Sequence, residues 1–331
     1  MILTFRNVYL TETSTVAGPY EAKGPLKHNF DKRYTKDLYC GAKSFEKAET
    51  KLLSDSLKIL LRKANMPKEE IDLIIAGDLL NQITASTYGS LELNTPFLGI
   101  YTACATSIEG MLIAATFIDA GKANNIISAC SSHNMTSEKQ FRNPTEYGSP
   151  KPMTATFTST GAASVLLTNK PSKIKVVNGL IGTIIDYKQK DVFNMGAVMA
   201  PAAMDTLYRY LKETKTKPSD YDLILTGDLG LYGKEILKDL MLDNYGIDIK
   251  ANYNDCGVML YDLKRQKEVL AGGSGPVCSA LVNYSTVIKG LKENKYKKVI
   301  LIATGALFSP MTVYQKENIL SIANLICLEA I

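Results

Sequence analysis

The spacing of apolar residues predicts a helix followed by a buried strand near the start of the chain. Over residues 46–64 the apolar positions recur every three to four residues, which places them on one helical face. Asn65 and Pro67 end this pattern, and the continuous apolar run IDLIIAG (71–77) is typical of a strand that is buried on both faces. The helical face consists of Leu52, Leu53, Ser56, Leu57, Leu60 and Leu61.

The same pattern returns in the second part of the chain. Residues 200–215 carry a similar helical face, Pro218 breaks the chain, and YDLILTG (221–227) is again a strand. Asp72 and Asp222 are 150 residues apart, and both strands end in Gly-Asp-Leu. This agreement over a helix, a break and a strand indicates an internal repeat. The second face consists of Met204, Leu207, Tyr208 and Leu211.

A further pair of segments supports the repeat. Residues 102–130 match residues 275–304 at an offset of 174, which aligns Cys104 with Cys278. Each copy is a turn, a helix, a short charged loop and a strand, so we expect two similar βα halves, 1–170 and 171–331. The halves should superpose, and one helix of each should be buried in the middle, beginning near the aligned cysteine. Ligands of such folds gather at the carboxyl ends of strands and at junctions.

Composition narrows the class of protein. The chain has 331 residues, of which 46% are apolar and 21% charged, as in ordinary globular proteins. Its 38 basic and 33 acidic residues give a formal charge of +5. The basic residues are scattered, so no nucleic-acid-binding face is expected. A positive charge of this size suits attraction of a small anion or a weak pull toward an anionic lipid surface.

The cysteines and the chain ends indicate a reducing, intracellular setting. The six cysteines form no CxxC pair and no dense framework, and a chain of this length does not need disulfides. The N-terminus has no apolar signal-peptide segment. The apolar C-terminal segment 319–331 has only thirteen residues, which is too short to span a bilayer, so we expect it to be a buried last strand.

Cys104 is the first candidate for chemistry. It lies between the strand-like segment PFLGI (96–100) and the helix-like segment MLIAATFIDAG (111–121). A cysteine at a helix N-terminus meets the positive end of the helix dipole, which favours the thiolate. Backbone N–H groups at the same place favour any bound anion. Cys104 is therefore a nucleophile or the wall of an anion-binding pocket.

Several strings carry a resemblance to known families. The two halves, the placement of Cys104 and STGAASVLL (159–167) resemble the thiolase-like superfamily, which includes the thiolases and the ketoacyl synthases. That resemblance implies a five-layered α/β arrangement of two pseudo-repeated halves. Longer strings are similar to the stage V sporulation protein AD family: AGDLLNQ (76–82), SSHN (131–134), EKQFRNPTEYG (138–148), NMGAVMAPAA (194–203), TGDL (226–229) and AGGSG (271–275).

The second resemblance implies a function. Members of that family bind dipicolinic acid, a pyridine dicarboxylate, and serve its movement into the developing spore together with integral membrane subunits. We therefore expect dipicolinic acid as ligand, alone or with calcium, and a location inside the cell at the spore inner membrane. No cofactor is expected. Thiolase-like proteins commonly dimerise through the first-half sheet edge, so a homodimer is a further expectation.

The catalytic groups of the superfamily are incomplete in this chain. Condensing enzymes pair the cysteine with two histidines, or a histidine and an asparagine, from the second half. The only histidines, His28 and His133, both lie in the first half, and Asp228 and Ser274 occupy the corresponding second-half positions. We expect a binding protein without catalysis. The alternatives are a ketoacyl-synthase-III-like acyltransferase that uses Cys104, and a structural subunit with an empty pocket.

The expected ligand-binding residues follow from these placements. Cys104 is expected to be a wall of the pocket, His133 a donor at a strand end, and Arg142 a fork for a carboxylate or a partner of Glu138 or Glu146. No His, Cys or Asp cluster has metal-ligand spacing, so no metal site is expected. The remaining candidates are Asp78, Asn81, Ser132, Asn194, Met195, Asp228 and Ser274.

Overall fold

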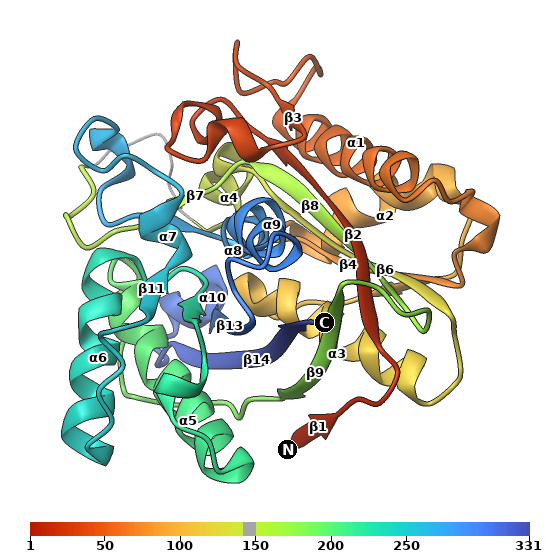
Figure 1. The fold of residues 1–331 in the computed structure, drawn as a ribbon. Helices are drawn as coiled ribbons and strands as arrows, with labels where there is room; N and C mark the ends of the chain where they lie inside the picture. Colours follow the sequence, from red (N-terminus) through yellow and green to blue (C-terminus); the bar gives the residue numbers. More distant parts are fainter. Residues whose placement is uncertain (142–149) are drawn as a thin grey trace.

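Helices and sheet alternate in layers through the molecule (Figure 1). The structure is a computed structural model that describes residues 1–141 and 150–331. Arg142, one of the expected carboxylate-binding residues, lies outside the described residues.

The first predicted helix and strand are present. Helix α1 is Phe45–Ala64, and strand β4 behind it is Leu73–Gly77. Ser44 caps the helix, because its side chain accepts a hydrogen bond from the Lys47 amide. Asn65 ends the helix in the left-handed conformation, with φ of 48°. The predicted face is buried through Leu52, Leu53, Ser56, Leu57 and Leu60.

The second copy follows the same plan. Helix α5 is Met195–Thr214 and strand β10 is Leu223–Thr226, so each begins 150 residues after its counterpart. Asn194 caps α5 by accepting a hydrogen bond from the Ala197 amide, and Lys215 ends it in the left-handed conformation. The predicted repeat is therefore confirmed in this helix and strand.

The sheet repeats as well. One path of strands runs through both parts, and its two five-stranded sections have the same order. They are joined by a short antiparallel contact between β2 and β9, where Tyr9 pairs with Lys175. The first section is β2 (Tyr9–Ala17), β8 (Gly161–Thr168), β6 (Asn125–Ser132), β4 and β5 (Phe97–Gly99). The second is β9 (Ile174–Leu180), β14 (Leu320–Ala330), β13 (Lys298–Leu307), β10 and β11 (Tyr253–Asp255).

Two buried helices lie between the sheet sections, as predicted. Helix α3 is Thr106–Asp119, and α8, Pro276–Val282, continues through a π-helical turn into α9, Ile288–Lys292. The hydroxyls of Ser107 and Ser279 are 2.8 Å apart, so the two helices meet near their N-termini. They begin close to Cys104 and Cys278.

Three buried apolar clusters correspond to the interfaces between layers. One surrounds the central helices, one packs α1 on the first sheet section, and one packs α5 and α6 (Gly230–Tyr245) on the second. With α2 (Thr84–Ser90) beside α1, this gives helix, sheet, helix, sheet, helix (Figure 1). The predicted five-layered α/β arrangement is therefore present.

The remaining elements are short. They are strands β1 (Ile2–Thr4), β3 (Lys32–Arg33), β7 (Phe157–Thr158) and β12 (Gly273–Ser274), and helices α4 (Asn134–Phe141), α7 (Cys256–Met259) and α10 (Pro310–Tyr314). Strands β7 and β12 pair with each other apart from the main sheet. The C-terminal segment forms β14, as predicted, and all six cysteines are free. In the described part of the chain, no helix has the length and apolar character needed to cross a membrane.

Candidate functional site

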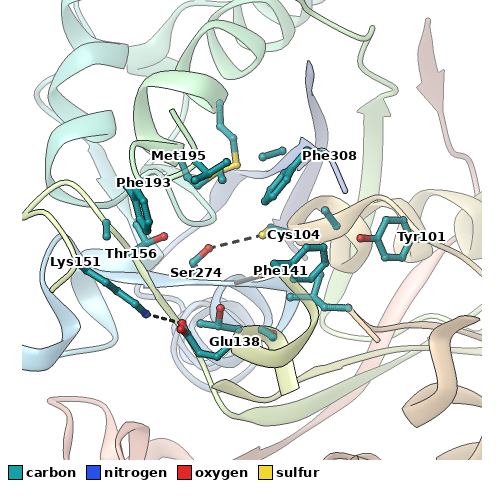
Figure 2. A pocket seen from close by; sticks show the side chains of 18 residues that line it. Tyr101, Cys104, Glu138, Phe141, Lys151, Thr156, Phe193, Met195, Ser274 and Phe308 are labelled. Atoms are coloured by element: carbon teal, nitrogen blue, oxygen red, sulfur yellow. Dashed lines mark hydrogen bonds and ion pairs between the residues drawn. The ribbon is translucent and has the colours of Figure 1, made fainter. Parts of the chain in front are cut away.

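A cavity of about 150 Å³ opens beside Cys104, where residues of both halves meet. Its lining is mainly apolar. Figure 2 shows Cys104 and Ser274 at the centre, with Met195 and Phe308 on one side and the pair of Lys151 and Glu138 on another. The apolar walls include Phe141, Phe193, Met195, Met199 and Phe308. The polar groups include Cys104, Ser137, Glu138, Lys151, Thr156, Thr158 and Ser274.

A tight turn holds Cys104 at the cavity. Ala103 has a φ of +50°, a conformation that costs a non-glycine residue about 1–2 kcal/mol. Thr106 stabilises the turn, because its hydroxyl donates to the Ala103 carbonyl at 2.7 Å and accepts from the Thr102 amide at 3.2 Å. The half-buried Cys104 side chain therefore faces the cavity directly before helix α3.

Behind Cys104 lies an acidic hydrogen-bond network. The Cys104 sulfur is 3.8 Å from the Ser274 hydroxyl oxygen, and that hydroxyl is 3.2 Å from Oδ2 of Asp228. Oδ2 also accepts from the Gly275 amide at 3.2 Å, and Oδ1 accepts from the Thr304 hydroxyl at 2.8 Å. The carboxylate is fully buried. Asp228 and Ser274, both expected ligand-binding residues, thus come together beside Cys104, but of the two only Ser274 lines the cavity.

The electrostatics of this network oppose a thiolate. Burial raises the pKa of Asp228 to about 6. Burial, and then the negative charge of Asp228, raise the pKa of the Cys104 thiol well above its ordinary value. The helix dipole alone had favoured the thiolate, but burial beside an acid outweighs it. Cys104 is therefore a neutral thiol at physiological pH.

His133 is not part of the cavity lining. Its Nε2 donates to the Leu38 carbonyl at 2.7 Å, and its Nδ1 accepts from the Met135 amide at 3.2 Å. The ring is fully buried, and burial lowers its pKa, so it is neutral. Because backbone groups occupy both nitrogens, the expected ligand donor at this strand end is a structural residue in this conformation.

Other expected residues also make structural contacts. Asp78 holds the loop after β4, because it accepts hydrogen bonds from the amides of Leu80 and Ser86 at 2.8 and 2.7 Å. Ser132 donates to the Ser159 carbonyl at 2.8 Å. Asn194 serves as the cap of α5 and does not line the cavity, whereas the next residue, Met195, does. Asn81 lies in an adjoining hollow that shares Tyr101, Phe141 and Phe308 with the cavity.

Sequence reasoning missed the cation and an unpaired hydroxyl of the site. Lys151 lines the cavity, and its Nζ lies 2.5 Å from a carboxylate oxygen of Glu138. Ser137 is 5% exposed, and its hydroxyl has no hydrogen-bond partner among the described residues. A signal for Ser137 exists: it is four residues before Phe141, so both lie on one face of helix α4.

Comparison with known proteins places the chain in a family. The family model "Stage V sporulation protein AD (SpoVAD)" matches residues 2–329. The chain belongs to this family. One relative, stage V sporulation protein AD of Bacillus subtilis (strain 168), is 44% identical over 317 residues, which cover 96% of this chain and 93% of the relative. The resemblance found in the sequence is confirmed, and with it a place in sporulation.

Several solved structures share the fold of this chain. The 3-oxoacyl-[acyl-carrier-protein] synthase III of Aquifex aeolicus VF5 matches with a TM-score of 0.58 and 14% identity, covering 97% of this chain and 99% of that one. OleA of Xanthomonas campestris, solved with bound lauric acid and lauroyl-CoA, matches with a TM-score of 0.62 and 14% identity, covering 98% and 99%. At this identity the likeness shows the fold alone.

The described lining combines a neutral thiol with aromatic and polar side chains. None of the described lining residues is a histidine, so no imidazole base meets the Cys104 thiol. Within residues 1–141 and 150–331, no group of three His, Cys, Asp or Glu side chains is placed to hold a metal ion. The described lining of the cavity offers aromatic walls, one lysine and several hydroxyl groups.

Proposed function

We propose that this protein binds dipicolinic acid in the Cys104 cavity without converting it, and thereby serves its movement into the developing spore. The observation that carries this proposal is the combination of aromatic walls with Lys151 and with the Ser137 hydroxyl, which has no hydrogen-bond partner among the described residues. A flat aromatic dicarboxylate needs apolar atoms against its faces and donors at its edges. Membership of the sporulation family supports the same ligand.

The size of the cavity suits a single ring. An apolar cavity of roughly 150 Å³ accommodates a benzene molecule, and the volume beside Cys104 is about 150 Å³. Phe141, Phe193 and Phe308 supply aromatic surface, and Met195 and Met199 supply adaptable sulfur-containing walls. The adjoining hollow leaves room for substituents to extend past Tyr101.

Donors for the carboxylates lie at the polar side of the lining. The Lys151 ammonium is the cation, and a hydrogen bond to a charged group contributes about 1.5–3 kcal/mol. Its side chain is 20% exposed, which leaves it screened from most of the solvent. Glu138 already pairs with Lys151, so a bound carboxylate competes with it or shares the cation. Ser137, Thr156 and Thr158 add hydroxyl donors.

The absence of turnover follows from the state of the thiol. A nucleophilic cysteine requires a lowered pKa or an adjacent base, and Cys104 has a raised pKa beside Asp228. The alternative function is that of an acyltransferase. Two observations favour this alternative: the strained turn at Ala103 and the fold shared with a 3-oxoacyl-[acyl-carrier-protein] synthase III. An acyl adduct on Cys104 would distinguish the two.

Membrane subunits and a second copy of the chain are proposed as partners, with the protein peripheral to the spore inner membrane. The exposed edge strand β5 supports a homodimer, because Phe97 and Leu98 are 37% and 38% exposed there. Tyr88 and Leu91 extend the exposed apolar surface close by. Analytical ultracentrifugation of the parent protein and Leu98→Lys tests this: a dimer that Leu98→Lys dissociates supports the proposal, and a monomeric parent protein contradicts it.

Calorimetry with dipicolinate tests the proposed ligand directly. Dipicolinate should bind with one-to-one stoichiometry, and benzoate, which has the ring but one carboxylate fewer, should bind at least tenfold more weakly. Titrations with and without calcium chloride show whether the cation accompanies the ligand. If dipicolinate binds neither with nor without calcium chloride, the proposal is contradicted.

A further inference from the structure

The Ser274 hydroxyl lies between the cavity and a buried acid. On one side it lines the cavity beside Cys104 (Figure 2), with its oxygen 3.8 Å from the Cys104 sulfur. On the other side it is 3.2 Å from Oδ2 of Asp228. A hydroxyl has a single proton to donate. While Asp228 is ionised, that proton is directed to the carboxylate, and the cavity meets the lone pairs of the serine oxygen. This orientation repels an anion.

We propose that Asp228 takes up one proton from solvent when an anion enters the cavity, and that this proton turns Ser274 into a donor to the anion. The inference rests on the proposed function, because it concerns the same cavity and the same ligand. It makes Ser274 a specificity-determining residue under the control of Asp228.

The proton balance of this step is simple. One proton leaves water and binds Oδ2 of Asp228, whose new O–H group then donates to the Ser274 oxygen. The Ser274 O–H rotates toward the ligand carboxylate. Oδ1 keeps its hydrogen bond from Thr304, and no bond between heavy atoms forms or breaks. One proton is consumed for each anion bound.

Among the residues that the structure describes, none of the titratable groups that interact with Asp228 is a cation that could compensate an added negative charge. The titratable groups that interact with it electrostatically are Asp255 and the thiols of Cys104, Cys256 and Cys278, which are neutral or acidic. The one lysine of the described lining, Lys151, is paired with Glu138. A ligand dianion that entered without a proton would be repelled by the ionised carboxylate of Asp228, because only the Ser274 hydroxyl separates the two.

Asp228 is better placed than Asp255 to accept this proton. Asp255 accepts hydrogen bonds from the Thr226 hydroxyl at 2.7 Å and from the amides of Leu229 and Gly230 at 2.9 and 3.0 Å. None of these donors lines the cavity. Asp228 instead accepts a hydrogen bond from the hydroxyl of Ser274, which lines the cavity. Burial raises the pKa of Asp228 to about 6, so a nearby anion needs to raise it only modestly further for protonation near neutral pH.

Calorimetry in two buffers of different ionisation enthalpy tests the inference, because the difference in heat gives the number of protons taken up. Dipicolinate contributes none, since ordinary carboxyl groups titrate near pH ~4. The parent protein should take up as much as one proton per ligand near pH ~7, between the Asp228 pKa of about 6 in the free protein and the higher pKa in the complex, and almost none at pH ~5. Over that interval the affinity should fall by up to tenfold for each pH unit.

Asp228→Asn should abolish both the proton uptake and the pH dependence of affinity. Glu21→Gln is the matched control, because Glu21 is also a buried carboxyl whose pKa burial raises, to about 7, but it bonds Tyr261 and the Thr160 amide instead of Ser274. The control should keep the proton uptake.

The outcomes separate this inference from the proposed function. Dipicolinate binding by the parent protein without proton uptake at any pH would overturn the inference and leave the proposed function standing. Proton uptake that disappears in Glu21→Gln but persists in Asp228→Asn would also overturn it. No binding of dipicolinate by the folded parent protein at any pH would overturn both. If Asp228→Asn fails to fold, the number of protons that the parent protein takes up per bound ligand still tests the inference.

Discussion

The Cys104 sulfur lies 3.8 Å from the Ser274 hydroxyl, and that hydroxyl donates to the buried carboxylate of Asp228. The resemblance of the sequence to the ketoacyl synthases implies that groups at these positions would activate the cysteine and polarise an acyl carbonyl. Here burial, and then the neighbouring carboxylate of Asp228, raise the pKa of the thiol and keep it protonated. Beside this thiol lies a cavity with apolar walls and a polar edge.

The first prediction concerns acyl transfer. Incubation with acetyl- and malonyl-CoA should leave the mass of the intact protein unchanged, because the pKa of the Cys104 thiol is raised and no described lining residue is a basic imidazole. Intact-protein mass spectrometry measures this. A stoichiometric acyl adduct that disappears in Cys104→Ser would favour the acyltransferase alternative.

The second prediction concerns Lys151. Lys151→Met should weaken dipicolinate binding by about 10- to 100-fold, because it removes the cation of the lining while keeping the length of the side chain. Lys139→Met is the matched control: Lys139 also pairs with a glutamate, Glu46, but it does not line the cavity. Equal affinities of the two variants in calorimetry would place the ligand elsewhere.

The third prediction separates structure from binding at His133. His133→Ala should lower the free energy of unfolding by about 2–4 kcal/mol, because it empties a buried ring position and leaves the Leu38 carbonyl without its donor. Urea unfolding measures the change. Calorimetry on the folded variant should give nearly the parent affinity for dipicolinate, and a specific 100-fold loss of affinity without loss of stability would restore His133 as a ligand donor.

The fourth prediction concerns pH and stability. Burial raises the pKa of Glu49 to about 8 and the pKa values of Glu21 and Asp255 to about 7. The folded chain therefore keeps protons that the unfolded chain loses above pH ~4, so this stabilisation is greatest below that pH and is lost as the pH rises toward 8. The loss should be on the order of a few kcal/mol between pH ~5 and ~8.

Urea unfolding across this range measures the slope. Glu49→Gln should flatten it, because a neutral side chain still has hydroxyl partners in Ser131 and Thr136. The carboxyl groups whose pKa is lowered, which include Glu12, Glu46 and Asp55, act in the opposite sense and only in acid, below pH ~4. Stability that increases between pH ~5 and ~8 would contradict this prediction.

The spacing of apolar residues predicted the repeated helices and strands well, because burial of one face requires apolar residues at regular intervals. The faces of α1 and α5 and the apolar runs of β4 and β10 are read directly from spacing, since each packs on one layer. The same holds for β14 at the C-terminus.

The cavity lining was harder to predict, because irregular segments supply much of it. Lys151 and Thr156 lie between α4 and β7, and Phe193 and Phe308 flank regular elements, so no spacing marks them. His133 misled for a related reason. Its position after β6 was clear from the sequence, but the direction of its side chain depends on Leu38, which is 95 residues away.

A crystal structure of the protein with saturating dipicolinate tests the central claim most directly. The account predicts the pyridine ring between the aromatic and methionine walls of the Cys104 cavity. One carboxylate should lie within hydrogen-bond distance, about 2.7–3.2 Å, of the Lys151 Nζ or the Ser137 hydroxyl. It also predicts an unmodified Cys104 thiol. An empty cavity with dipicolinate bound at another surface would contradict the account.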